Sequence, residues 1–336
     1  MNTAIIAVIL GTIVILGFVF VVPRGVVDYD PRPGIRAQVI VDLDPNANDL
    51  SINAGGITVD KDGMLYVSDN SGRILRINPE NPRPEVVGTV PGNGNSPQDL
   101  RGLAFDRDQN LYIAGGESGQ IWKLDVDKIS TTMPGTAALF ASGLNYTDGM
   151  AFDRFGRLLV TNPIRGYVWE VDTTTRVNNI YASGLVSRES DSPIGVNGIA
   201  VARSGHVFVS NTANGVIHII ETRKESGYVE AVLIWRSDPR LIGADGMQFD
   251  AAGNLWIAVS ARNAIVAITP DKEIIEVSIN GNTGPLEFPA GLAFSGDALY
   301  VINSDSAVGE NKQRGPGIGP SISKLGVGVI GQRIPP

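Results

Sequence analysis

Three oxygen-bearing side chains recur at a regular spacing in the middle of the chain, each directly before a glycine. They are Asp148, Asn197 and Asp245, which are separated by 49 and 48 residues. Carboxylate and amide oxygens are the ligands that hard cations such as Ca²⁺ prefer in proteins. A bound cation of this kind can act as a Lewis acid on an oxygen atom of a bound substrate.

The three residues belong to a longer motif, a small or polar residue followed by glycine and an apolar residue, which occurs six times. Its copies are Gly55-Gly56-Ile57, Arg101-Gly102-Leu103, Asp148-Gly149-Met150, Asn197-Gly198-Ile199, Asp245-Gly246-Met247 and Ala290-Gly291-Leu292. Their central glycines, called repeat glycines below, lie 46, 47, 49, 48 and 45 residues apart. A fixed period of this size is typical of propellers, solenoids and arrays. The residue before each repeat glycine is therefore expected at an equivalent place in every repeat.

Each repeat has the composition of short β-strands. Residues 56–75 read GITVDKDGMLYVSDNSGRIL, in which three apolar strands are separated by turns that contain Asp and Gly. A fourth, outer strand fits the apolar run before the next copy. Four strands in each of six repeats, with no amphipathic helix pattern, predict an all-β, six-bladed β-propeller, with a sandwich or an open solenoid as the alternative.

The N-terminal segment differs from the repeats. Residues 4–22 form an uncharged apolar run of 19 residues, which as a helix spans about 28 Å. We therefore expect a transmembrane anchor over residues 1–23, a linker over 24–36 and the propeller over 37–336. A cleaved signal peptide is the alternative, but no Lys or Arg precedes the run and no clear cleavage site follows it.

Residues 37–43 have the alternating apolar pattern of a strand and precede the first repeat. We expect it to supply an outer strand to the last blade and so to close the ring. The third and fourth strands of that blade are expected late in the chain, over residues 321–330.

A second set of polar residues ends the strand that follows each repeat glycine. Antiparallel geometry brings these strand ends to the same channel mouth as the residues before the repeat glycines. The predicted mouth therefore collects Asp69, Asn162, Asn211 and Asn303 beside Arg101, Asp148, Asn197 and Asp245. The alternative for the second set is that these side chains cap turns. Arg101 can also pair with Asp148 or Asp245, which would fill the ring without a metal.

Composition excludes several functions. The formal net charge is −8, which argues against nucleic acid as a partner, because that surface needs clustered Lys and Arg. The chain has no cysteine, so disulfides, zinc–thiolate sites and thiol nucleophiles are excluded.

The motifs Asn197-Gly198-Ile199-Ala200 and Asp245-Gly246-Met247, each followed by a turn and an apolar strand, resemble the SMP-30/gluconolactonase/LRE-like family and its NHL-repeat relatives. The similarity covers roughly residues 50–305. The resemblance implies a divalent metal, often calcium, and hydrolysis of lactones or related esters. The family's metal ligands in blades four and five match Asn197 and Asp245. Thr147 stands where blade three of the family has Asn, and Gly55 where blade one has Glu.

Because half of that ligand set is replaced, the sequence favours a membrane-anchored, non-catalytic propeller that acts as an accessory subunit of a membrane complex. The propeller is expected on the extracytoplasmic (periplasmic or extracellular) side, mostly by family resemblance. The alternative is a hydrolase of a small-molecule lactone or ester, in which Asp148, Asn197 and Asp245 hold Ca²⁺ or another divalent cation and Asp245 is catalytic. A third, weaker possibility is the strictosidine-synthase-like branch, which needs no metal.

Overall fold

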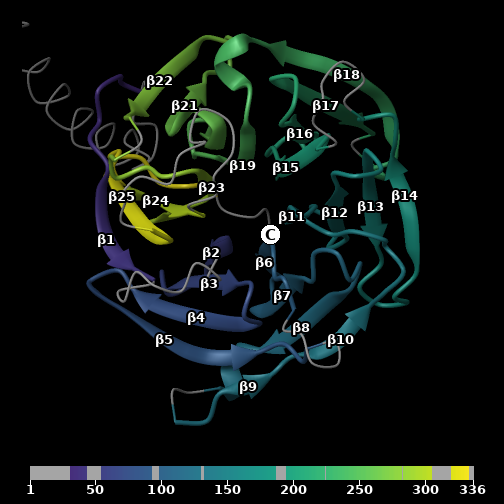
Figure 1. The fold of residues 1–336 in the computed structure, drawn as a ribbon. Coiled ribbons are helices and arrows are strands. Elements are labelled where there is room, and N and C mark those ends of the chain that lie inside the picture. The colour runs from purple at the N-terminus through teal and green to yellow at the C-terminus, as the bar shows by residue number, and fades with distance from the viewer. Residues whose placement is uncertain are drawn as a thin grey trace, which may run out of the picture.

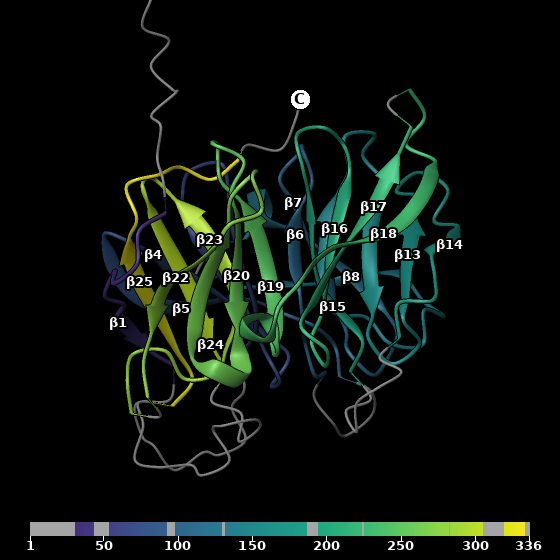
Figure 2. The ribbon, with the colours of Figure 1, turned by 90° about the horizontal axis from the view of Figure 1, so that it is seen from above.

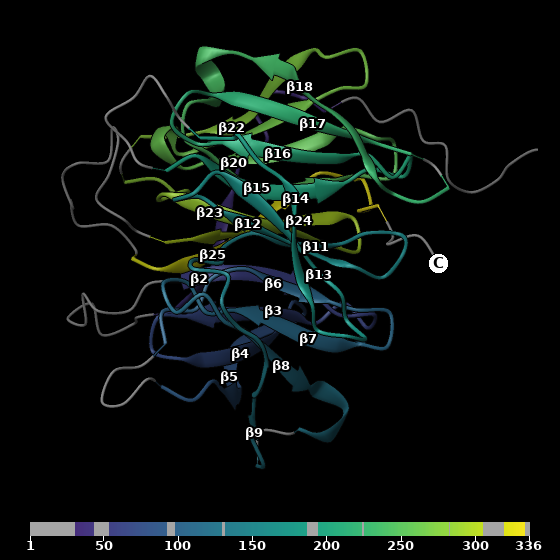
Figure 3. The same cartoon turned by 90° about the vertical axis from the view of Figure 1, so that its right-hand side faces the viewer.

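The computed structural model describes residues 31–43, 54–92, 98–129, 132–186, 194–223, 225–281, 283–304 and 319–332. These residues form six sheets that stand like blades around a central channel (Figure 1). Figures 2 and 3 show the same disc edge-on, with the strands crossing its thickness. The prediction of an all-β, six-bladed β-propeller is therefore confirmed.

Four strands build each blade, from the channel outwards. The innermost strands are β2 (Ala54–Val59), β6 (Leu103–Phe105), β11 (Met150–Phe152), β15 (Val196–Val201), β19 (Ala244–Phe249) and β23 (Pro289–Ser295). The second strands are β3 (Leu65–Asp69), β7 (Asn110–Ala114), β12 (Leu158–Asn162), β16 (Val207–Asn211), β20 (Leu255–Val259) and β24 (Ala298–Asn303). Four of the innermost strands begin one residue before the motif, and β6 and β11 begin at its third residue.

The outer half of each blade follows the same order. The third strands are β4 (Arg73–Asn78), β8 (Ile121–Asp125), β13 (Tyr167–Val171), β17 (Val216–Thr222), β21 (Ala264–Ile268) and β25 (Ser321–Gly326). The outer strands are β5 (Asn81–Thr89), β10 (Ala138–Ala141), β14 (Asn178–Ala182), β18 (Val229–Ser237), β22 (Ile274–Ile279) and β1 (Gln38–Asp42). A two-residue strand, β9 (Gly135–Thr136), adds to β5 in parallel.

The described residues contain three short 3₁₀ helices and no helix that is long and apolar enough to cross a membrane. The three are η1 (Val126–Lys128), η2 (Pro239–Leu241) and η3 (Ser260–Arg262). The predicted transmembrane anchor over residues 1–23 lies outside the described residues.

The repeat glycines are explained by how closely neighbouring blades approach each other. A Cβ atom placed on Gly149 would lie 2.6 Å from the carbonyl oxygen of Asn197, and one on Gly246 would lie 2.7 Å from that of Ala290. Gly56, Gly102 and Gly198 meet the carbonyl oxygen of the next blade's motif residue in the same way. Only glycine allows this approach, so the motif marks the contact between successive blades.

Aromatic pairs hold the blades together farther out. An aromatic side chain on the second strand of one blade packs edge-on against a Phe on the innermost strand of the next. The ring centroids are 5.1 Å apart for Tyr66–Phe105, 5.2 Å for Tyr112–Phe152, 5.1 Å for Phe208–Phe249 and 5.8 Å for Trp256–Phe294. Such edge-to-face pairs add roughly 0.5–1.5 kcal/mol each to the burial of the rings.

The two ends of the described chain close the ring. Strand β1 pairs antiparallel with β25, with Gln38 opposite Lys324 and Asp42 opposite Ser321. The predicted closing strand at residues 37–43 is therefore confirmed. The expectation of two strands over residues 321–330 is wrong, because only β25 forms there and β1 takes the outer place.

The chain after β25 runs to blade five, and residues 327–332 are called the C-terminal tail below. Gly331 forms an isolated bridge with Asp250, and the Gln332 amide donates to the Phe249 carbonyl at 2.8 Å. The tail therefore lies against the innermost strand of blade five instead of extending blade six.

Candidate functional site

Asp148, Asn197 and Asp245 line one small cavity within the channel. Its volume is about 90 Å³, and the repeat glycines and the apolar residues after them complete its wall. Gly55 and Ala290 lie in the same wall but bring no polar side chain. The structure thus brings together the three oxygen-bearing residues of blades three, four and five.

A hydrogen-bond chain fixes the orientation of the Asn197 amide. The Thr212 hydroxyl donates to the Ala244 carbonyl at 2.8 Å, so its oxygen is free to accept from Asn197 Nδ2 at 3.2 Å. This arrangement uses the amide nitrogen and leaves Asn197 Oδ1 as the atom that can meet a ligand. Thr212, on the loop after β16, was not among the predicted site residues, because nothing in the repeat pattern marks it.

Hydroxyl groups also anchor the backbone of the site across blade boundaries. Thr161 Oγ1 donates to the Asn197 carbonyl at 2.6 Å, and Ser210 Oγ donates to the Asp245 carbonyl at 3.0 Å. The donor in each case lies on the second strand of the preceding blade. The position of each site residue therefore depends on its neighbouring blade.

The surroundings of the two carboxyl groups disfavour their charged forms. Burial raises the pKa of Asp148 to about 6, although the positive charge of Arg101 opposes the shift; the charge of Asp99 adds to it. Burial and then the charge of Asp148 raise the pKa of Asp245 well above its usual value. Two carboxyl groups of perturbed pKa in one cavity are a common property of reaction centres.

Arg101 pairs with a residue outside the predicted ring. Its Nη2 lies 2.6 Å from Asp99 Oδ2, and its Nε donates to the same oxygen at 3.1 Å. Burial alone would lower the pKa of Arg101, but Asp148, Tyr146 and Asp99 together outweigh it and raise that pKa. Arg101 therefore stays charged beside the site, with Asp99 as its ion-pair partner.

The second set of predicted polar residues is buried and holds loops. Asp69 accepts from the amides of Ser71 and Arg73, each at 2.9 Å, and forms an ion pair with the Arg73 side chain. Asn162 donates to the Leu144 carbonyl at 2.9 Å and accepts from the Arg165 amide at 3.0 Å.

Asn211 and Asn303 are used in the same way. Asn211 Nδ2 donates to the Leu185 carbonyl at 3.1 Å. Asn303 Nδ2 donates to the Pro285 carbonyl, and its Oδ1 accepts from the Glu287 amide, both at 3.2 Å. None of the four residues of this set lines the cavity of Asp148, Asn197 and Asp245.

The donor set at the cavity consists of two carboxylates and one amide oxygen. Thr147 is fully buried and its hydroxyl donates to the Gln120 carbonyl at 3.2 Å, so it does not replace a ligand. Within the described residues, no group of three or more His, Cys, Asp or Glu side chains could hold a metal ion. Three oxygen donors fit a hard divalent cation whose remaining positions are filled by water.

The fold and this cavity define a six-bladed β-propeller with a polar site in its channel. The family model described as SMP-30/Gluconolactonase/LRE-like region matches residues 180–304, which include Asn197 and Asp245. A second model, described as strictosidine synthase-like, N-terminal, matches residues 56–77. The resemblance to the SMP-30/gluconolactonase/LRE-like family is therefore confirmed.

Solved structures of several propellers are similar to this one. Regucalcin of Agrobacterium tumefaciens, titled a calcium-binding protein, is 16% identical with a TM-score of 0.66, over 91% of this chain and 98% of that one. A gluconolactonase of Xanthomonas campestris is 17% identical with a TM-score of 0.62, over 88% and 91%. A putative gluconolactonase is 15% identical with a TM-score of 0.65, over 90% and 96%. At these identities the similarity shows the fold alone, and no curated protein matches the chain.

These comparisons correct the main functional prediction. The sequence favoured a non-catalytic accessory subunit because Gly55 and Thr147 replace two metal ligands of the family. The family match over residues 180–304 instead favours the alternative, a hydrolase of the lactonase type. The error came from treating the missing ligands as evidence that the site has no chemistry.

Proposed function

We propose that the protein is a lactonase- or esterase-type hydrolase whose reaction centre is the cavity lined by Asp148, Asn197 and Asp245. One observation carries the proposal: three oxygen-bearing side chains from consecutive blades line a single cavity of about 90 Å³. The family match over residues 180–304 includes two of the three.

The electrostatic cost of this cavity supports a functional role. Burial raises the pKa values of both Asp148 and Asp245, which means that the charged forms of these side chains destabilise the folded protein. A channel lined only by small or apolar side chains would avoid that cost. Stability is commonly lower at functional sites for this reason.

Each residue has a role that its contacts suggest. Asn197 presents Oδ1 because Thr212 occupies its amide nitrogen. In the cation-free site Asp245 is a stronger base than an ordinary Asp because its pKa is raised, and we propose that it accepts the proton of the attacking water. The charge of Arg101 beside the cavity favours the negative charge that develops on the substrate oxygen.

A divalent cation such as Ca²⁺ fits the same residues. Asp148, Asn197 and Asp245 would hold it, and when bound it would polarise the carbonyl group of the substrate. Because carboxyl ligands must lose their protons to bind a metal, we expect cation affinity to fall as the pH drops below about 6, where Asp148 becomes protonated.

The proposal is tested by incubating the full-length protein with a panel of γ- and δ-lactones and aryl esters, with and without Ca²⁺. The expected result is acid release above the uncatalysed rate for at least one class of substrate. If Asp245→Asn releases acid at the same rate as wild type, the reaction takes place outside this cavity. If no substrate releases acid above the uncatalysed rate, the proposal is contradicted.

A further inference from the structure

The channel contains a second cavity, which adjoins the one lined by Asp148, Asn197 and Asp245 and is larger than it. Its volume is about 170 Å³, which is similar to a cavity of about 150 Å³ that holds a benzene molecule in another protein. Six residues, each directly after a repeat glycine, line both this cavity and the polar one. They are Ile57, Leu103, Met150, Ile199, Met247 and Leu292. The two cavities are therefore adjacent parts of one channel, called the polar end and the far end below.

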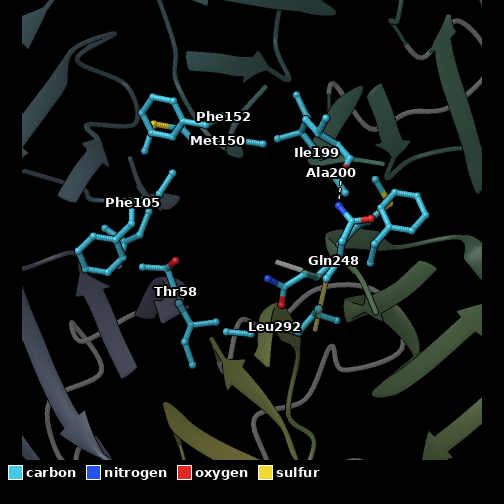
Figure 4. Close-up of a pocket in the computed structure, with 17 residues that line it drawn as sticks. Thr58, Phe105, Met150, Phe152, Ile199, Ala200, Gln248 and Leu292 are labelled. Carbon is cyan, nitrogen blue, oxygen red and sulfur yellow. Dashed lines mark hydrogen bonds between the residues drawn. The ribbon is translucent and has the colours of Figure 1, made fainter. Parts of the chain in front are cut away.

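The far end is wide because small residues occupy one position in most blades. The residue two places after each repeat glycine lines it, and four of the six are alanines. The set is Thr58, Ala104, Ala151, Ala200, Gln248 and Ala293. Figure 4 shows the side chains of Thr58 and Gln248 directed towards the open centre.

The C-terminal tail completes the wall of the far end. Gln332 lines the cavity, and its side-chain amide donates to the Val201 carbonyl and accepts from the Arg203 amide, both at 3.0 Å. Its backbone amide donates to the Phe249 carbonyl at 2.8 Å. These bonds tie the tail to blades four and five, so the cavity is part of the folded structure.

The polar groups of the far end carry no charge. Among the described residues that line it there is no Asp, Glu, Lys, Arg or His. Gln248 Oε1 accepts from the Phe294 amide at 3.0 Å, which leaves its Nε2 to donate into the cavity. The hydroxyl of Thr58 can both donate and accept.

We propose that the far end is a binding site for a small uncharged molecule, of the size of one six-membered ring, that carries carbonyl or hydroxyl oxygens. Gln248 Nε2 suits a carbonyl oxygen, and the apolar side chains suit the carbon atoms of the ring. An ion would lose its hydration and gain no opposite charge from the wall, so charged molecules of the same size are excluded. This site goes beyond the proposed hydrolase function and does not depend on it.

One consequence does rest on the proposed function. Hydrolysis of a lactone turns an uncharged ring into a hydroxy acid, which is an anion at neutral pH. The far end would then accept the substrate and reject the product.

The test uses a probe that cannot be hydrolysed by the proposed reaction. Binding of δ-valerolactam to the full-length protein is measured by calorimetry and ligand-observed NMR, beside the anion tetrahydropyran-4-carboxylate. We expect the lactam to bind at least tenfold more tightly than the anion. Ala151→Leu, which fills the cavity, should weaken lactam binding at least tenfold, and Thr58→Val about fivefold, the worth of one hydrogen bond.

Two control variants locate the binding. Ala138→Leu places the same bulk on the exposed outer strand β10 and should leave the lactam affinity unchanged. Asp245→Asn alters only the polar end and should also leave it unchanged. If Asp245→Asn abolishes lactam binding, if the anion binds as well as the lactam, or if wild-type protein binds neither, the proposal is wrong. If Ala151→Leu shows no cooperative thermal transition, it has not folded, and the effect of Thr58→Val on lactam affinity is used as the test.

These outcomes separate the two proposals. Lactam binding that responds to Thr58→Val in a protein without hydrolytic activity supports the far-end site and contradicts the hydrolase. Hydrolytic activity in a protein that does not bind the lactam overturns the far-end site alone.

Discussion

At the scale of single residues, the charge of the site is set by a few neighbours. Asp148 and Asp245 are half-buried in the wall of the same cavity, and the charge of Asp148 raises the pKa of Asp245 further. Arg101 opposes both shifts without forming an ion pair with either carboxyl group. Protons and, in our proposal, a cation therefore compete for the same two carboxyl groups.

Asp148→Asn should stabilise the cation-free protein at pH 7 by on the order of 2 kcal/mol. The folded-state pKa of Asp148 is about 6 and its ordinary value is 3.8. The ionised side chain therefore costs stability, and this cost grows as the pH rises from 3.8 to 6 and is complete above 6. Thermal melts between pH 3.5 and 8, in the presence of a chelator, should show that Asp148→Asn melts at a higher temperature than wild type. This difference in melting temperature should vanish near pH 3.5. The exposed Asp271→Asn is the control, and an equal gain at all pH values would contradict the pKa assignment.

Thr212→Val should weaken Ca²⁺ binding roughly tenfold, because loss of a side chain that orients a metal ligand typically costs 10–100-fold in affinity. Thr212→Ser keeps the hydroxyl that accepts from Asn197 Nδ2 and should restore most of the affinity. Calorimetric titration of the three proteins measures the effect. Equal affinity of the Val and Ser variants would mean that Thr212 does not position Asn197.

At the scale of elements, the repeat motif predicted what depends on local spacing. It located the innermost strands and brought Asp148, Asn197 and Asp245 to one cavity, because the same contact between blades recurs at each repeat glycine. It did not predict the role of Thr212 or the path of the C-terminal tail. Those features depend on side chains that meet only in the folded chain.

Gly149→Ala should destabilise the protein by roughly 1–3 kcal/mol, the usual cost of adding an atom to a closely packed site. The added Cβ would lie 2.6 Å from the Asn197 carbonyl oxygen and force blades three and four apart. Gly281→Ala is the matched control, because no atom lies within 4 Å of its Cβ position. Denaturant unfolding measures both, and equal stabilities would contradict the role given to the repeat glycines.

At the scale of the whole molecule, closure of the ring joins residues from the two ends of the chain. β1 belongs to the same sheet as β25, and Val41 packs in a core that includes Ile322. The sequence predicted this closure from the alternating apolar pattern before the first repeat. The membrane anchor over residues 1–23 stays a prediction.

Val41→Asp should destabilise the full-length protein by roughly 3 kcal/mol or more, because it places an unpaired charge in the core that closes the ring. Val41 is only 4% exposed. Gln38→Asp changes an exposed residue of the same strand and should cost less than about 0.5 kcal/mol. The melting temperatures of the two variants make the comparison. Similar values would mean that β1 contributes little to closure.

The central claim is that the cavity lined by Asp148, Asn197 and Asp245 is the reaction centre of a hydrolase. The measurement that tests it most directly is kcat for the best lactone or ester substrate, compared between wild type, Asp245→Asn and the control Asp271→Asn. We predict that Asp245→Asn lowers kcat by at least about 100-fold, the usual worth of a positioned general base, while Asp271→Asn leaves it unchanged. A kcat of Asp245→Asn within a few-fold of wild type would contradict the account.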